Sequence, residues 1–360
     1  MSETIALNIP NVTVTDLVTI LTNLYVRAIE KGKPFKNILT PFLWGAPGIG
    51  KSNGVYQLAD NLAKATGKTV KVTDLRLLLF SPIDLRGIPM ADAKREFTDW
   101  LKPRIFDMPT DNDTVNLLFL DELSSAPSTL QAAAYQICLD RQVGEHALPD
   151  NCIVIAAGNR MTDHSVSYKM PKALCNRLMH FNVQSDYDTW RKWAIHNDIH
   201  PSIIAFLGLD SSRLCLTPES SDLAYSTPRT WEAVSTLLYT VSEDPEEIHH
   251  LIAACVGNAM ALEFEAYCKG ALHLPDIRAI LNGTYTDIPR GYDVIFALIT
   301  ALLAALPKAD DCALENVCRY VQRFPKDFTV MFMQDLQLLP DMNKRLIKCR
   351  SFQMWLNKNG

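Results

Sequence analysis

The sequence lacks a long apolar run, a patterned set of cysteines and a secretory start. Its most apolar stretch, Val294 to Leu306, has 13 residues and is followed by Pro307, so it predicts a buried helix and no membrane span. The nine cysteines include no Cys-x-x-Cys pair, which argues against a zinc site or a disulfide framework. No basic region followed by an apolar run begins the chain, so we expect no signal peptide and a cytoplasmic location.

The sequence also lacks an excess of positive charge. Its formal net charge is -5, which provides no overall field for nucleic acid, although a local basic patch stays compatible with that value. With 48% hydrophobic and 21% charged residues, the composition is ordinary for a globular protein. The length of 360 residues favours two or three domains.

The pattern along the chain changes once, near residue 185. Before that point, short apolar runs alternate with helical patterns, and after it only helical periodicity is found. Five strands are predicted, at residues 37–45, 68–74, 116–122, 152–159 and 180–183. Strands that are apolar throughout and alternate with helices indicate a parallel sheet covered on both faces. The sequence therefore predicts an α/β domain followed by a helical one.

The stretch "GAPGIGKS" has the spacing of a loop that binds a nucleoside triphosphate. Its glycines let backbone N–H groups surround phosphate oxygens at the start of the next helix. Lys51 can reach the β- and γ-phosphates, and the Ser52 hydroxyl can bind Mg²⁺. The candidate nucleotide-binding residues are Gly45, Ala46, Pro47, Gly48, Ile49, Gly50, Lys51, Ser52 and Asn53.

Two acids end the strand predicted in "LLFLDE". We assign Asp121 to the Mg²⁺ shell and Glu122 to activation of the attacking water. A phosphate loop without a base could serve as a switch that only binds nucleotide, so the adjacent Glu122 favours hydrolysis. At the end of the following strand, the Asn159 amide is a candidate for orienting that water or sensing the γ-phosphate. Asn beside Gly is also a common turn residue, so both interpretations of Asn159 stay open.

These motifs resemble those of the AAA+ ATPases of the MoxR group, within the clade that carries an insert in its second helix. "GAPGIGKS" matches the Walker A element, "LLFLDE" the Walker B element and "AAGNR" sensor 1, and the matches run from about residue 37 to 235. The resemblance implies a P-loop NTPase core with a parallel sheet, followed by an all-α lid. The expected parts are an N-terminal helical segment (1–36), a nucleotide-binding domain (37–186) and a helical lid with a C-terminal helical region (187–360).

The resemblance also assigns two arginines. Arg177, in "MPKALCNRLMHFNV", would be the arginine finger, and Arg229, in "STPRTWE", would belong to sensor 2 at the start of a lid helix. Most single arginines are solvated surface residues, so ordinary ion-pair roles stay open for both. Arg141 and Arg160 are left unassigned. Residues 88–103 interrupt the α/β alternation, and their polar central turn predicts an exposed hairpin.

The sequence has no Asn-Lys-x-Asp motif for recognition of guanine. The resemblance implies ATP as the nucleotide. It implies a homo-oligomeric ring, most often hexameric in this family, that remodels or matures a partner protein. A separate protein with a von Willebrand factor A domain would be the expected partner. Two alternatives stay open: the nucleotide-driven subunit of a nucleic-acid-processing or restriction complex, and a nucleotide-gated scaffold. Nucleic acid is not expected as a partner on charge grounds.

Overall fold

The computed structural model describes residues 8–160, 170, 172–216, 222–271, 275–289, 291–339 and 341–359. The chain separates into two compact units. Unit 1 comprises residues 1–185 with 218–220, and unit 2 comprises residues 186–217 and 221–360. The first seven residues of the predicted N-terminal helical segment, and Pro171 of the predicted finger segment, lie outside the described residues.

Unit 1 is built on a six-stranded parallel sheet with the strand order β1-β10-β2-β9-β6-β3. The strands are β1 (Asn11–Val12), β2 (Thr40–Trp44), β3 (Thr69–Arg76), β6 (Thr114–Asp121), β9 (Cys152–Gly158) and β10 (Leu178–Val183). Five of them lie where the sequence predicts strands, so the parallel sheet is confirmed. The edge strand β1 was not predicted, because two residues carry no periodicity.

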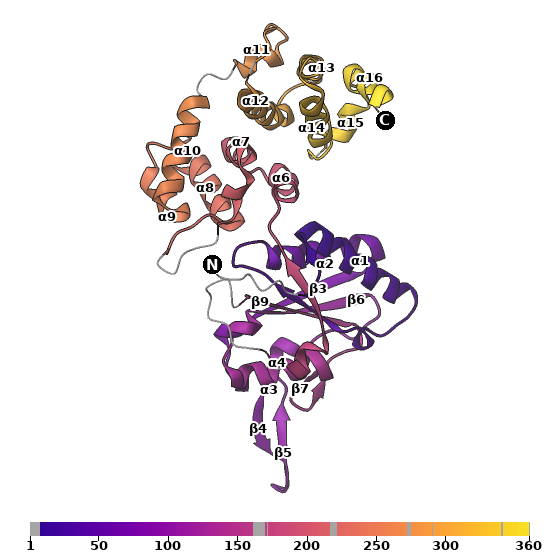
Figure 1. Ribbon diagram of the computed structural model, residues 1–360. Helices are drawn as coiled ribbons and strands as arrows, with labels where there is room; N and C mark the ends of the chain where they lie inside the picture. Colours follow the sequence, from indigo (N-terminus) through magenta and orange to yellow (C-terminus); the bar gives the residue numbers. More distant parts are fainter. Residues whose placement is uncertain are drawn as a thin grey trace. The chain divides into compact units, whose positions relative to one another are not determined.

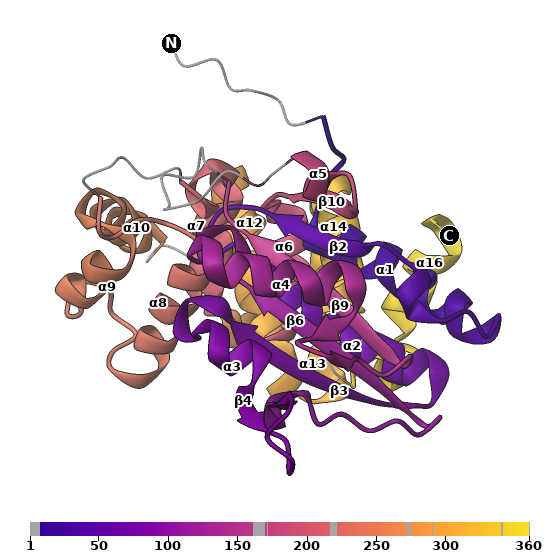
Figure 2. The ribbon, with the colours of Figure 1, turned by 90° about the horizontal axis from the view of Figure 1, so that it is seen from below.

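Helices cover both faces of this sheet, as expected for strands that are apolar on both sides (Figure 1). On one side lie α1 (Val14–Glu30) and α2 (Lys51–Thr66), which pack together. On the other side lie α3 (Pro82–Arg86), α4 (Ser128–Asp140) and α5 (Lys172–Cys175). Seen from below, α4 crosses the strands β6 and β9 (Figure 2).

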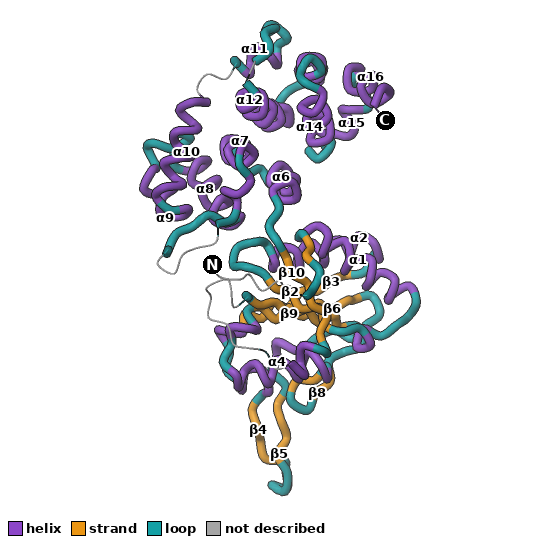
Figure 3. Tube along the Cα trace, in the orientation of Figure 1, coloured by secondary structure: helices purple, strands orange, loops and turns teal. Residues whose placement is uncertain are grey.

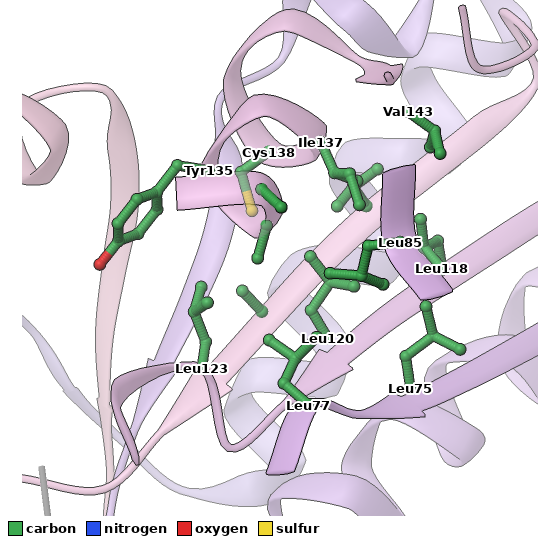
Figure 4. Close-up of a cluster of buried hydrophobic side chains, with 14 of the residues drawn as sticks. Leu75, Leu77, Leu85, Leu118, Leu120, Leu123, Tyr135, Ile137, Cys138 and Val143 are labelled. Carbon is green, nitrogen blue, oxygen red and sulfur yellow. The ribbon is translucent and has the colours of Figure 1, made fainter. Parts of the chain in front are cut away.

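The core under α4 buries one face of β6 and β9. Leu118 and Leu120 of β6 and Leu75 of β3 point toward Ile137 and Cys138 of α4 (Figure 4). All five side chains are at most 3% exposed. Burying a large aliphatic side chain contributes about 1.5–3 kcal/mol, so this layer fixes the central strands and the loops that follow them.

Two antiparallel hairpins extend unit 1. The strands β4 (Ile88–Ala91) and β5 (Thr98–Leu101) form the hairpin predicted at residues 88–103, which points away from the sheet (Figure 1). Its turn is ordered by Asp92, whose carboxylate accepts hydrogen bonds from the backbone N–H groups of Glu96 and Phe97. The shorter hairpin of β7 (Gln142–Val143) and β8 (His146–Ala147) precedes β9.

In unit 2 the described chain contains only helices and loops, which confirms the predicted helical region (Figure 3). The helices are α6 (Tyr187–His196), α7 (Pro201–Leu209), α8 (Pro228–Thr240), α9 (His249–Val256), α10 (Asn258–Ala271), α11 (Ile277–Leu281), α12 (Tyr292–Ala305), α13 (Asp311–Val321), α14 (Lys326–Leu336), α15 (Met342–Leu346) and α16 (Arg350–Asn359). One apolar cluster surrounds Trp231 and Phe264, and another surrounds Leu298 and Phe332. The predicted buried helix at 294–306 is α12. None of the helices among the described residues combines the length and the apolar character needed to cross a bilayer.

Candidate nucleotide site

The phosphate loop connects β2 to α2 at the carboxyl edge of the sheet. Gly48 and Gly50 have φ values of +79° and +100°, a region that only glycine adopts without strain. A Cβ on Gly45 would lie 2.9 Å from the Val183 carbonyl oxygen, so this glycine also permits a close backbone approach. The loop ends at the N-terminus of α2, where backbone N–H groups favour an anion.

Lys51 contacts both the loop and the residue that follows β9. Its ammonium nitrogen lies 2.6 Å from the Gly45 carbonyl oxygen, 2.9 Å from that of Ala46 and 3.1 Å from Asn159 Oδ1. The residue is only 8% exposed, and a buried ammonium needs such oxygen partners. The contact brings Asn159, which follows β9, to the ammonium group of Lys51.

Ser52 and Asp121 form the second element of the site. The Ser52 hydroxyl donates to Asp121 Oδ2 at 2.9 Å, and Asp121 Oδ1 accepts the backbone N–H of Glu122 at 2.8 Å. Mg²⁺ prefers oxygen ligands and is usually held by one or two carboxylates together with substrate phosphates and water. This pair of oxygen groups beside a phosphate loop fits that ion. Within the described ranges, no cluster of three or more His, Cys, Asp or Glu residues suits a metal held by protein alone.

Glu122 has an unusual backbone. Its φ of 60° and ψ of 27° are left-handed, a conformation that residues other than glycine seldom adopt. The sharp turn follows β6, which is buried along almost its whole length, and the Glu122 N–H donates to the preceding aspartate. Strained conformations of this kind gather at functional sites, so the backbone supports a functional constraint on Glu122.

Ser124 fixes the backbone of Asn159, a contact that sequence reasoning missed. The Ser124 hydroxyl accepts the Asn159 N–H at 2.9 Å and donates to the Asn159 carbonyl oxygen at 3.0 Å. A Cβ on Gly158 would lie 2.6 Å from that hydroxyl oxygen, so glycine is required before Asn159. Both hydrogen bonds join residues that are 35 positions apart in the sequence, so no local sequence pattern predicts them.

A further acid lies close to Asp121. Tyr56, four residues after Ser52 on α2, donates its hydroxyl to Asp74 Oδ2 at 3.1 Å. Burial raises the pKa of Asp74, and the negative charge of Asp121 raises it further, while the Tyr56 hydrogen bond opposes both. The charge of Asp121 acts on the pKa of Asp74, so these two acids near the ends of β6 and β3 lie close enough to interact. Sequence reasoning missed Asp74, because it lies on β3 away from any motif.

The arginines have different surroundings. Arg177 lies between α5 and β10, and its exposed side chain makes no hydrogen bond or ion pair with the rest of the described chain. Arg229 is exposed at the second position of α8 and belongs to unit 2. Arg141 is 9% exposed and donates to the Ile38 carbonyl oxygen at 3.1 Å, which points to a structural role. Arg160 donates to the Val183 carbonyl oxygen at 3.4 Å.

The structure thus brings together the loop, Asp121, Glu122 and Asn159 at one edge of the sheet. The ends of β2, β6 and β9 supply them, and these three strands are adjacent. In open α/β sheets, ligands bind outside the carboxyl ends of the strands, where the strand order reverses. The chain runs outward from β2 to β3 and returns through β6 and β9 before crossing to β10, so β2 marks such a point.

No family model matches this sequence, and no curated protein matches it. Among solved structures, it is similar to PCH-2 of C. elegans at 15% identity, with 72% of this chain and 69% of that chain covered and a TM-score of 0.36. A Thermotoga maritima RuvB mutant is similar at 15% identity, with 84% and 89% covered and a TM-score of 0.36. The Aeropyrum pernix ORC2 protein is similar at 13% identity, with 88% and 96% covered and a TM-score of 0.41. The strand order and loop geometry of this chain, and not these similarities, define its fold.

Proposed function

We propose that this chain binds ATP with Mg²⁺ and hydrolyses it. The observation that supports this proposal is the joint placement of Lys51, the Ser52–Asp121 pair, Glu122 and Asn159 at the carboxyl edge of one sheet. A site that only bound phosphate would need the loop and the lysine. The acid on a strained backbone and the amide beside the lysine are groups that hydrolysis requires in addition.

Each group has a distinct task in this proposal. Lys51 and the loop N–H groups bind the phosphates, and Ser52 and Asp121 would hold Mg²⁺, which neutralises phosphate charge when bound. Glu122 accepts a proton from the attacking water, and Asn159 keeps that water in line. ATP is favoured over GTP because the sequence lacks the guanine-reading motif and resembles AAA+ ATPases of the MoxR group.

The site also needs positive charge on the γ-phosphate during transfer. We assign that task to Arg177 of an adjacent subunit, which requires a closed homo-oligomer, six-membered by the family resemblance. Arg177 is exposed on unit 1, which is compatible with contact to a nucleotide bound by an adjacent subunit. Arg229 is proposed as the sensor 2 residue of the lid.

We propose that the energy of ATP hydrolysis drives a conformational change in a partner protein. Among the described residues of unit 1, eleven large hydrophobic side chains are exposed, and eight of these lie between residues 78 and 105. They include Leu79 at 79% and Phe97 at 71% exposure, on and beside the β4–β5 hairpin. Apolar side chains gathered on a projecting element mark protein contacts rather than nucleic-acid contacts. A partner with a von Willebrand factor A domain is the expected candidate by the MoxR resemblance.

Three variants test the hydrolytic part of the proposal. Lys51→Ala is expected to weaken binding of a fluorescent ATP analogue, because it removes a cation that contacts phosphate. Glu122→Gln is expected to preserve binding and to slow steady-state phosphate release by roughly 10²–10⁴-fold, the usual effect of a positioned base. Arg177→Ala is expected to bind ATP normally and to lose turnover by roughly 10³–10⁵-fold.

Mixtures of the variants test the ring. Lys51→Ala and Arg177→Ala proteins are each inactive, but a mixed assembly contains sites with an intact loop from one subunit and an intact arginine from the next. Recovery of phosphate release across mixing ratios supports the arrangement, provided that subunit exchange is verified. A wild-type rate for Glu122→Gln would contradict the base assignment. Negligible turnover of the wild type would favour the scaffold, and stimulation by DNA with strong salt dependence would favour a nucleic-acid role.

A further inference from the structure

Two side chains connect the phosphate loop to the turn that carries Arg177. The Trp44 indole Nε1 lies 2.9 Å from His180 Nδ1, and His180 Nε2 lies 2.8 Å from the Cys175 carbonyl oxygen. The indole N–H can only donate, so Nδ1 accepts its hydrogen bond. Nε2 therefore carries the proton and donates to the Cys175 carbonyl. Both ring nitrogens are used, which fixes the tautomer and the orientation of the imidazole.

The strand register holds this connection rigidly. On the adjacent parallel strands β2 and β10, His180 is paired with Phe42, and Asn182 with Trp44. The Trp44 and His180 rings stack at 6.0 Å between centroids and 27° between planes, and Phe42 packs against Trp44 at 4.4 Å. Aromatic pairs of this geometry add about 0.5–1.5 kcal/mol beyond their buried area.

The two ends of this hydrogen-bonded connection, Trp44 and Cys175, lie next to two parts of the candidate site. Trp44 immediately precedes Gly45, whose carbonyl oxygen lies 2.6 Å from the Lys51 ammonium. Cys175 ends α5, and Arg177 follows two residues later, with its N–H bonded to the Leu174 carbonyl oxygen at 2.9 Å. One end of the connection therefore lies at the residue before the phosphate loop, and the other lies at the end of the helix before Arg177.

We infer that His180 is a positioning residue for Arg177. Its bond to Trp44 couples the position of Arg177 to the conformation of the phosphate loop in the same subunit. Arg177 in turn acts at the nucleotide site of the adjacent subunit. The inference rests on the proposed function, in which Arg177 serves an adjacent site. A displacement of about 1 Å in a positioned group can lower a rate about 10²-fold, so a fixed hydrogen bond two residues from Arg177 is enough to matter.

The test separates the donor of the arginine from its acceptor. In a mixture of Lys51→Ala and Arg177→Ala proteins, turnover comes only from Arg177→Ala sites that receive Arg177 from Lys51→Ala subunits. His180→Phe keeps an aromatic ring and removes both hydrogen bonds. Placed on the Lys51→Ala donor, it is expected to lower kcat by roughly 10–100-fold with the KM for ATP unchanged. Placed on the Arg177→Ala acceptor, it is expected to leave the rate of the mixture unchanged.

Two further variants keep the test decisive. Trp44→Phe removes the same hydrogen bond from its other end, so on the donor it is expected to lower kcat as well, and the double variant is expected to lose less than the product of the two effects. His250→Phe, at an exposed histidine of unit 2, is the matched control and is expected to change nothing. Circular dichroism and thermal midpoints check that each variant folds.

The possible outcomes are distinct. Donor-specific loss supports the inference. Equal losses on donor and acceptor, or a raised KM on the acceptor, would overturn it and leave His180 as a support of its own phosphate loop. Full activity of both donor variants would overturn it too. An inactive reference mixture with verified subunit exchange would refute the action of Arg177 on a neighbour, and the inference would fall with that part of the proposed function.

Discussion

Removing the Ser124 hydroxyl should destabilise unit 1 and displace Asn159. The hydroxyl makes two hydrogen bonds, at 2.9 and 3.0 Å, with the N–H and the carbonyl oxygen of Asn159, and Ser124 is only 2% exposed. A net hydrogen bond contributes about 0.5–1.5 kcal/mol, and a buried polar group left unpaired costs about 1–3 kcal/mol. Asn159 is half-buried, so water can replace part of the loss. We therefore expect Ser124→Ala to lower the free energy of unfolding by about 1–2 kcal/mol.

Calorimetry of the full chain measures this change. The transition that added nucleotide raises belongs to unit 1, because ligand binding stabilises the unit that binds. A loss of about 1–2 kcal/mol should lower its midpoint by about 2–8 °C for a unit of this size. Ser125→Ala, at the neighbouring half-buried hydroxyl, is the control. The kcat for ATP should fall in Ser124→Ala while nucleotide affinity changes little. An unfolding midpoint and a kcat equal to those of Ser125→Ala would refute the reasoning.

Two other predictions concern the hairpin and a histidine pair. Replacing residues 91–96 with a Gly-Ser turn should leave nucleotide affinity and basal phosphate release unchanged but abolish action on the protein partner, and loss of the folded state would show that the turn is structural. In unit 2, the hydrogen bond to Glu265 raises the pKa of His249. The stabilising effect should be fully present below the unfolded pKa of about 6.5 and vanish as pH rises through the higher folded pKa. His249→Gln should therefore lower the thermal midpoint more at pH 5.5 than at pH 8.5, and an equal effect at both values would contradict this origin.

The fold could be predicted where periodicity is local. The predicted strands 116–122 and 152–159 have continuous apolar runs at 117–120 and 152–157, and the structure buries β6 and β9. The segment 245–270 has one continuous helical pattern, yet the structure divides it into α9 and α10 at Gly257, whose φ is +88°. A Cβ there would lie 3.0 Å from the Ala224 carbonyl oxygen, so the break depends on a residue distant in sequence. Periodicity alone could not reveal it.

The candidate site likewise has parts that local sequence predicts and parts that it does not. The phosphate loop and the two acids could be predicted, because their chemistry lies in a few consecutive residues. Trp44 packs against Phe42, but its bond to His180 spans 136 residues and depends on the pairing of β2 with β10. The position of the third acid, Asp74, near Asp121 depends likewise on the pairing of β3 with β6. The supporting contacts of the site come from strand register, which the sequence does not display.

Strand register also explains why the supporting contacts lie where they do. Every strand of a parallel sheet ends at the same edge, so a group at the end of one strand can be held by a group at the end of its neighbour. Asp121 ends β6 and accepts the hydroxyl of Ser52, which lies beyond β2, while Ser124 beyond β6 bonds to Asn159 beyond β9. On the other side of β2, the bond between Trp44 and His180 reaches β10, which begins directly after Arg177. The strands on both sides of β2 therefore contribute, because β6 and β9 supply candidate catalytic groups and β10 supplies His180, which bonds to Trp44 and to the turn before Arg177. In the ring that we propose, a change at the end of β2 would reach both sides at once, as coupled turnover between adjacent subunits would require.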